Sequence, residues 1–284
     1  MKNIIKEHLG QAIYLLSNRR PWRLGYGAYR RRFLYETLHN ESILENFRKS
    51  KPLPGKYGFR LDARSIEIPW VLSRVAKRKG RLLDAGSALN HEVVLTSPAL
   101  NNKQISIVTL APEPTCFYSL GVSYVFGDLR DLYFKDESFD TVTCISTIEH
   151  VGMDNTRYVQ SNMIVQGEQN DFLVAIQELR RVVKKGGTLY ITFPFGRYEN
   201  HVWFQQFNGE MVDKLVERFN PFNCEEAIYK YDPDGWKLSD RIASKDCEFF
   251  DVHTSKYFDP KSDIEYPIDY PAGERAVACL ELQK

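Results

Sequence analysis

The stretch "RLLDAGSALNHE", residues 81–92, decides the fold of this chain. An apolar run that ends in an acid and a glycine, here Asp84 and Gly86, is typical of a first strand that leads into a ligand loop of an α/β protein. Ala88 and Asn90 stand where such loops more often carry further glycines. The stretch therefore predicts a ligand loop after the first strand, and its few glycines restrict which ligands fit.

Apolar runs separated by helical stretches repeat along the chain from this point. They lie at 81–85, 105–110, 122–126, 139–145 and 188–193, and two more follow at 224–231 and 275–282. Continuous apolar character is typical of parallel strands that helices cover on both faces. The rhythm predicts an α/β fold, a Rossmann-like doubly wound sheet that is mostly parallel with an antiparallel C-terminal edge strand, plus a helical N-terminal extension.

Three helices can be placed from local signals. The stretch "DFLVAIQELRRVVKKGG" predicts a helix with Asp171 as its N-cap and a stop at 184–186. Asn208 is a cap candidate for the next amphipathic helix, and Pro69 suits the first turn of a helix before the first strand.

The chain also divides by composition. Residues 1–60 are basic, aromatic and helix-prone, and they end in the breaker-rich "KPLPGKYG" at 51–58. We therefore expect a basic helical N-terminal extension over 1–60 and the α/β domain over 61–284.

Charge is unevenly distributed. The whole chain has a net charge of +1, but residues 1–32 hold eight basic residues and one acid, which gives +7 there and −6 in the remainder. A basic, aromatic head could meet an anionic membrane through residues 1–35, a phosphorylated substrate or a nucleic acid. Alternatively it is an arm that folds onto the acidic remainder. The balance of the whole molecule makes no case for a DNA partner.

The cysteine count and the apolar runs bear on location. Five scattered cysteines without a CxxC pair favour a reduced, cytoplasmic protein. The N-terminal "AIYLL" is too short for a signal peptide, and no run reaches the roughly 20 apolar residues of a spanning helix. We expect a soluble protein, peripheral to the inner face of the membrane if the basic head binds lipid.

The loop excludes two classes of nucleotide site. A dinucleotide site needs G-x-G-x-x-G, and counting from Gly86 those positions are Gly86, Ala88 and His91. A P-loop sequence is absent as well. Asp84 would lie beside the phosphates, so a ligand with adenosine and no phosphate suits the loop better, and a dehydrogenase is the weakest reading.

Five pieces in order resemble the class I S-adenosylmethionine-dependent methyltransferases of the type 11 kind. They are "LLDAGS", an acid after the second strand, "GDLRDLYF", "FDTVTCISTIEHV" and "ELRRVVKKGGTLYITFP", and they cover about 81–195. "DPDGW" and "AVACLEL" further on are similar to methyltransferases associated with bacterial surface-polysaccharide biosynthesis. The resemblance implies S-adenosyl-L-methionine as cofactor.

The resemblance also implies the cofactor-binding residues. The acid and glycine of the first loop would hold the amino-acid end, a carboxylate after the second strand would hold the ribose hydroxyls, and the acid of "GDLRDL" would meet the adenine amino group. Matched onto this chain, the cofactor-binding candidates are Asp84, Gly86, Ser87, Glu113, Asp128, Leu129 and Ser146.

The catalytic candidates follow the fourth and fifth strands. An alcohol acceptor must lose its proton, and His150 in "STIEHV" has a side chain that titrates near working pH. Glu149 stands beside it, and His201 in "FGRYENHVWFQQF" is a second base candidate. In relatives where an "EH" pair holds a metal, an acid precedes the Glu by three residues. Ser146 stands there, so we expect no metal.

The absence of one motif favours oxygen over nitrogen as the acceptor atom. Methyltransferases of amino groups in adenine or glutamine carry [DNS]-P-P-[FYW] where this chain has "STIEHV". The sequence therefore favours O-methylation of a small or glycan-type acceptor. The polar stretch 152–171 lies where a substrate lid could sit, although a connection explains it equally well.

Two alternatives remain at this point. One is a catalytically inactive methyltransferase-fold scaffold, suggested by the glycine-poor loop. The other is an RNA methyltransferase that uses the basic head, for which RNA affinity would fall steeply with salt. The oligomeric state is not fixed by any feature of the sequence.

Overall fold

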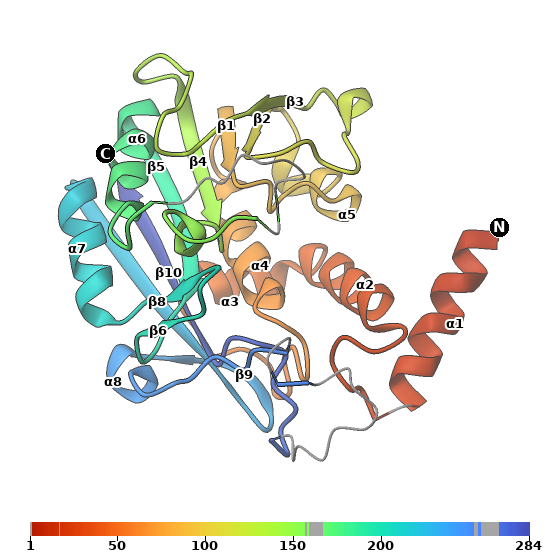
Figure 1. The fold of residues 1–284 in the computed structure, drawn as a ribbon. Coiled ribbons are helices and arrows are strands. Elements are labelled where there is room, and N and C mark those ends of the chain that lie inside the picture. The colour runs from red at the N-terminus through yellow and green to blue at the C-terminus, as the bar shows by residue number, and fades with distance from the viewer. Residues whose placement is uncertain (1, 17, 157, 159–166, 253–254, 257–266) are drawn as a thin grey trace.

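The computed structural model describes residues 2–16, 18–156, 158, 167–252, 255–256 and 267–284. A central sheet of eight strands has the order β3-β2-β1-β4-β5-β10-β8-β9 (Figure 1). The strands are β1 (Gly80–Ala85), β2 (Lys103–Thr109), β3 (Ser123–Phe126), β4 (Phe139–Ile145), β5 (Val183–Pro194), β8 (Asn223–Asp232), β9 (Gly235–Ser239) and β10 (Ala276–Gln283).

Strand direction follows the predicted scheme. Strands β1 to β5 pair in parallel, whereas β10 pairs antiparallel with both β5 and β8. The Rossmann-like, mostly parallel sheet is therefore confirmed, and β10 is inserted between β5 and β8 rather than added at the margin. A small ladder of β6 (Glu199–Asn200) and β7 (Gln205–Gln206) lies outside this sheet.

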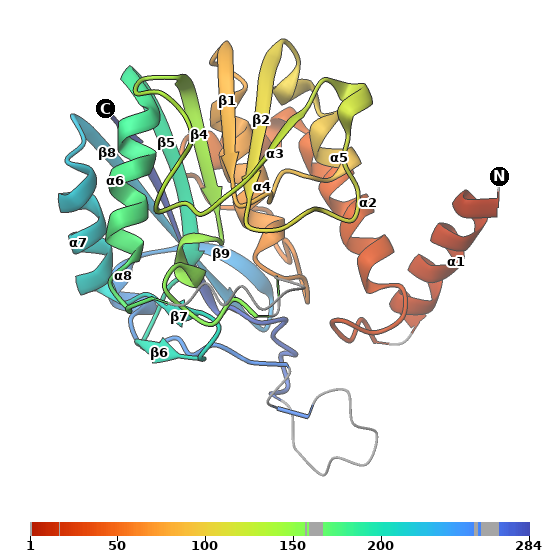
Figure 2. The same cartoon turned by 45° about the horizontal axis from the view of Figure 1, so that its top comes forward.

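Helices cover both faces of the sheet (Figure 2). One face carries α6 (Phe172–Val182) and α7 (Gly209–Phe219), and the other carries α2 (Tyr26–Leu38), α3 (Glu41–Arg48), α4 (Arg64–Val75) and α5 (Glu92–Leu95). Leu83 and Leu82, neighbours on β1, belong to the two different buried clusters. This alternation is the physical reason for the continuous apolar runs, because both faces of each inner strand are buried.

The basic N-terminal segment is partly built into the core. Leu34, Leu38, Leu44 and Phe47 of α2 and α3 belong to the same buried cluster as β1 and α4. Among the described helices and strands, α1 (Lys2–Leu16) projects from the body, at the outer edge of the molecule in Figures 1 and 2. The boundary between 1–60 and 61–284 stays a prediction.

The helix predicted around Pro69 begins earlier than expected. α4 starts at Arg64, so Pro69 lies inside the helix and leaves the carbonyl of Ser65 without its usual N–H partner. The hydroxyl of Tyr57 donates to that carbonyl at 2.8 Å. A distant side chain therefore replaces the missing backbone bond, which the local sequence signal could not show.

Two further boundaries differ from expectation. α6 ends at Val182, where β5 begins at once, so 184–186 form part of the strand segment and not a helix stop. Asp171 is the N-cap residue, but its carboxylate bonds Arg130 and makes no cap hydrogen bond. Asn208 does cap α7, accepting from the N–H of Met211. Strand β9 and the short helix α8 (Arg241–Ser244) were not predicted.

Two findings bear on the expectations about location. All five cysteines are free. Among the described residues, no helix combines the length and the apolar character needed to cross a bilayer.

Candidate functional site

The loop after β1 keeps its one glycine for a steric reason. Gly86 has φ +111°, and a Cβ built there would lie 2.0 Å from Oγ1 of Thr147 after β4. Its N–H donates to the carbonyl of Val108 on β2 at 2.8 Å. Ser87 follows with φ +63°. The loop therefore lies between the ends of β2 and β4, the two strands that flank β1, and at position 86 only glycine fits.

Asp84, at the end of β1, holds this loop through hydrogen bonds. Its carboxylate accepts hydrogen bonds from the N–H of Leu89 at 2.8 Å and from the hydroxyl of Thr143 at 2.9 Å. The side chain is fully buried, and burial raises the pKa of Asp84 to about 6. The acid fixes the turn that runs from the strand into the loop.

Asn90 connects the loop to the chain that follows β2. Its side chain donates to the carbonyl of Thr115 at 2.9 Å and accepts from the hydroxyl of Tyr124 at 2.7 Å. The loop is thereby attached to the segment that carries Glu113. No local pattern indicates this contact.

The acid after β3 is held firmly. Asp128 receives hydrogen bonds from the backbone N–H of Arg130 at 2.8 Å and from its guanidinium at 2.7 Å. Arg130 also reaches Asp171 at 2.6 Å, so it ties the end of β3 to the start of α6. Leu129 is buried beside this acid.

Three acids lie at the carboxyl ends of three strands that are consecutive in the sheet, the edge at which open α/β sheets bind ligands in a crevice. Asp84 is the penultimate residue of β1, and Glu113 and Asp128 follow β2 and β3. Carboxylates at this edge disfavour a pyrophosphate but accept hydrogen bonds from hydroxyl and amino groups. The residues present fit S-adenosylmethionine, whose sulfonium and ammonium groups are cationic.

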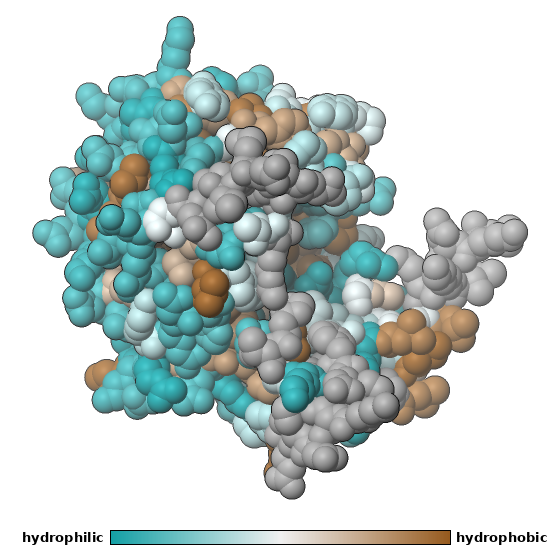
Figure 3. Space-filling model, in the orientation of Figure 1, coloured by the Kyte–Doolittle hydropathy of each residue, from teal (hydrophilic) through white to brown (hydrophobic). Residues whose placement is uncertain are grey.

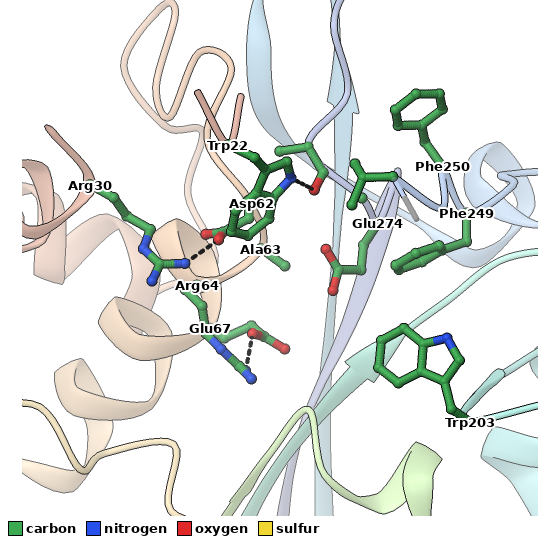
Figure 4. Close-up of a pocket in the computed structure, with 13 residues that line it drawn as sticks. Trp22, Arg30, Asp62, Ala63, Arg64, Glu67, Trp203, Phe249, Phe250 and Glu274 are labelled. Atoms are coloured by element: carbon green, nitrogen blue, oxygen red, sulfur yellow. Dashed lines mark hydrogen bonds and ion pairs between the residues drawn. The ribbon is translucent and has the colours of Figure 1, made fainter. Parts of the chain in front are cut away.

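A cavity of about 300 Å³ opens near this crevice. It is lined by Trp22, Arg30, Asp62, Ala63, Arg64, Glu67, Trp203, Phe249, Phe250, Val252, Ala272, Gly273 and Glu274. These residues come from five separate segments of the chain. Figure 4 shows charged side chains on one side of the space and Trp203 and Phe249 on the other.

An ion pair at the start of α4 connects the cavity with the strand ends. Arg64 bonds Glu67 at 2.7 Å and donates to the carbonyl of Ile145, the last residue of β4, at 3.4 Å. The Glu67 carboxylate accepts hydrogen bonds from the hydroxyls of Ser146 at 2.5 Å and Thr192 at 2.7 Å. Ser146, predicted to bind the cofactor, therefore points its hydroxyl to the cavity side.

Glu274 stands between the two walls of the cavity (Figure 4). Its carboxylate has no ion-pair or hydrogen-bond partner from another residue in the described parts of the chain. Burial and, next, the nearby charge of Glu67 raise the pKa of Glu274 to about 7. The sequence did not single it out, because "AGER" contains no recognisable motif.

Glu149 and His150, the two predicted catalytic residues of "STIEHV", lie behind the aromatic wall that Trp203 and Phe249 form. Nδ1 of His150 is 2.8 Å from the carbonyl oxygen of Trp203, and the two rings stack at 5.2 Å. Burial lowers the pKa of His150 to about 4. Burial also raises the pKa of Glu149 well above its ordinary value, and its Oε1 is 3.9 Å from Nε2 of His150.

His201 belongs to a different cluster. Its Nε2 is 2.9 Å from Glu199 and its Nδ1 is 3.9 Å from Asp251, while its ring stacks on Phe204 at 4.5 Å. His201 does not line the cavity. Within the described parts of the chain no group of three or more His, Cys, Asp or Glu side chains is arranged to hold a metal. Part of the polar stretch predicted as a lid, residues 157 and 159–166, lies outside the described residues.

Comparisons with known proteins agree with this geometry. Residues 87–191 match the family model described as a methyltransferase domain. No curated protein matches the sequence of this chain.

Solved structures are similar to this chain at low sequence identity. A 1,6-didemethyltoxoflavin-N1-methyltransferase of Burkholderia thailandensis, with bound S-adenosylhomocysteine, is 12% identical with a TM-score of 0.46, covering 88% of this chain and 89% of that one. A possible histamine N-methyltransferase of Thermotoga maritima is 15% identical with a TM-score of 0.46, covering 88% and 100%. No residue role is taken from these likenesses.

The family match and the sheet order agree with each other. Residues 87–191, which match the methyltransferase domain model, contain β2, β3 and β4 of the mostly parallel, Rossmann-like sheet.

Proposed function

We propose that this protein transfers a methyl group from S-adenosylmethionine to a hydroxyl oxygen of a small, sugar-type acceptor. The observation that carries the proposal is the contact between the cavity and the strand ends: Arg64 lines the cavity and bonds the last carbonyl of β4. An acceptor in the cavity would thus lie beside a cofactor in the crevice. Methyl transfer needs this in-line alignment more than it needs acid–base groups.

The cofactor side of the proposal uses the crevice. The loop at Gly86 and Ser87, with Asp84 beneath it, would hold the amino-acid end, Glu113 the ribose, and Asp128 with Leu129 the adenine. Ser146 would contribute through the loop after β4, although its hydroxyl bonds Glu67. When bound, the cofactor supplies an electrophilic methyl group on a positively charged sulfur.

The chemistry of the cavity walls supports a sugar as acceptor. Trp203 and Phe249 present flat aromatic faces, and such faces attract the weakly positive C–H groups of a sugar ring. Glu274, which stands between the two walls, can bond hydroxyl groups. Apolar walls with a few polar groups are the usual composition of small-molecule sites. A role in polysaccharide biosynthesis in the cytoplasm is consistent with such an acceptor.

Calorimetric titration with S-adenosylhomocysteine, with NADH as control, tests the cofactor site. We expect micromolar binding of the first and none of the second. Labelled S-adenosylmethionine and a panel of methyl glycosides and amino sugars then test the acceptor class, and we expect label on hydroxyl groups. Failure to bind S-adenosylhomocysteine would favour the inactive scaffold.

The outermost helix supports a second, independent proposal about location. Leu9 and Leu16 of α1 are 60% and 88% exposed, and Leu24 is 72% exposed. α1 packs on the start of α2 through Gly10, where a Cβ on Gly25 would lie 1.8 Å from the Gly10 carbonyl oxygen. In Figure 3 an apolar patch lies on the part of α1 nearer the body of the molecule.

Exposed leucines in a segment of charge +7 favour an anionic lipid surface as the partner. We expect the protein to sediment with vesicles that contain phosphatidylglycerol and not with pure phosphatidylcholine vesicles. Leu9→Glu with Leu16→Glu should reduce binding at least tenfold, and Val202→Glu, at an exposed site elsewhere, should not. Equal binding to both vesicles would refute the proposal, and salt-sensitive RNA binding instead would favour the nucleic-acid alternative.

A further inference from the structure

We infer that Glu274 is the group that takes the proton from the acceptor hydroxyl during methyl transfer. This inference rests on the proposed function and names a catalytic residue for it. It places the acceptor between the aromatic wall of Trp203 and Phe249 and the carboxylate of Glu274.

The backbone around Glu274 is fixed by contacts on both sides of the cavity. The indole N–H of Trp22 donates to the carbonyl of Ala272 at 2.8 Å, and the N–H of Phe250 donates to the carbonyl of Gly273 at 3.0 Å. Two residues further on, the N–H of Phe195 donates to the carbonyl of Ala276 at 2.9 Å, at the start of β10. Three separate segments therefore hold in place the backbone that carries Glu274.

The other charged groups that line the cavity are paired with one another. Arg30 is paired with Asp62, and Arg64 with Glu67. Glu274 is the remaining charged residue of the lining, and its carboxylate has no partner of this kind within the described residues. It is therefore available to a ligand, whereas Glu67 already accepts three hydrogen bonds.

The residues around Glu274 also shift the pKa of its carboxyl group. Burial, Glu67 and Asp62 raise the pKa of Glu274 and Arg64 lowers it, and the balance lies at about 7. A base whose pKa is near the working pH is present as carboxylate in a large fraction of molecules and still has a useful affinity for a proton. His150 is less suited, because its Nδ1 bonds Trp203 and burial lowers its pKa to about 4. We assign His150 the role of a positioning residue for Trp203.

Methyl transfer and loss of the hydroxyl proton occur together in this step. An oxygen lone pair of the acceptor attacks the methyl carbon, the bond between sulfur and that carbon breaks, and its electron pair remains on sulfur as a neutral thioether. The hydroxyl proton passes to the carboxylate of Glu274. The acid then returns the proton to solvent through the open mouth of the cavity.

Glu274→Gln tests the inference, with Glu248→Gln as a matched control. Glu248 is an exposed carboxylate that pairs with Arg197 at the surface. The probes are the methyl glycosides and amino sugars, with labelled S-adenosylmethionine. We expect Glu274→Gln to lower kcat about a hundredfold, the low end of the usual range for a general base, with KM changed less than threefold. Calorimetric affinity for S-adenosylhomocysteine should not change.

The pH profile separates a base from a merely structural residue. Because the carboxylate is the active form, kcat of the wild type should rise with pH through about 7, and this rise should be absent in Glu274→Gln. Glu248→Gln should keep both rate and profile.

Each contrary result has a distinct meaning. An unaltered kcat and pH profile in Glu274→Gln would overturn the inference while leaving the proposed function intact. A wild type that binds S-adenosylhomocysteine but places label only on amino groups, or on no probe, would overturn both the inference and the sugar hydroxyl as acceptor, while leaving the cofactor site intact. A wild type that does not bind S-adenosylhomocysteine would overturn the proposed function itself.

Discussion

The strand-end crevice and the cavity beside α4 are built in different ways. The crevice comes from the ends of three neighbouring strands, and its acids lie between residues 84 and 128. The cavity is assembled from five segments that span residues 22 to 274. A site made by one sheet edge leaves a readable order of motifs in the sequence, whereas a site made by distant segments does not.

The largest effect should come from the crevice. Gly86→Ala places a Cβ 2.0 Å from Thr147 Oγ1 at a backbone conformation that alanine rarely adopts. The loop must move, and we expect affinity for S-adenosylhomocysteine to fall more than a hundredfold in calorimetry.

Gly121→Ala is the matched control for that change. Gly121 also has a positive φ, +76°, but a Cβ there would meet nothing within 4 Å. It should cost about 1 kcal/mol of stability from backbone strain and leave ligand affinity unaltered. If both variants lost binding equally, the loss would reflect general strain and not the crowded strand ends.

A smaller effect is expected behind the cavity wall. His150→Phe keeps an aromatic ring against Trp203 but removes the hydrogen bond to its carbonyl. We expect kcat to fall about fivefold, with the pH profile unchanged, in steady-state assays with the labelled cofactor. A loss of a thousandfold would instead identify His150 as the base.

The smallest effect concerns the helix that carries Arg64 and Glu67. Tyr57→Phe removes the donor to the Ser65 carbonyl, which Pro69 leaves unbonded, and should lower the free energy of unfolding by about 1–2 kcal/mol. In that background Pro69→Ala supplies an N–H and should recover part of the loss in urea titrations. Additive losses would show that the two residues are not coupled.

The sequence predicted most of the sheet because strand signals are local. The seven apolar runs became β1 to β5, β8 and β10, and the antiparallel strand next to β5 was expected. The predicted start of α4 was wrong. Pro69 is tolerated inside the helix because the Ser65 carbonyl, which lacks its usual N–H partner, accepts a hydrogen bond from Tyr57, twelve residues before Pro69. Local signals cannot include such a contact.

The candidate site was only partly predictable for the same reason. Asp84, Gly86 and Asp128 could be located because each follows a strand, although their contacts with the cofactor remain proposals. Glu274 could not be found, since its importance depends on Arg64, Glu67 and Trp203 meeting it across the fold. His150 and His201 were predicted from residue type alone, and the sequence could not show that the His150 ring stacks on Trp203.

The position of β10 has a consequence for synthesis on the ribosome. The strand lies between β5 and β8, although both are translated before it. While the chain emerges, β5 and β8 cannot become neighbours without excluding the strand still to come. A nascent chain can therefore form the β1 to β4 edge early, but the wall that holds Glu274 closes only after residue 283 has left the exit tunnel.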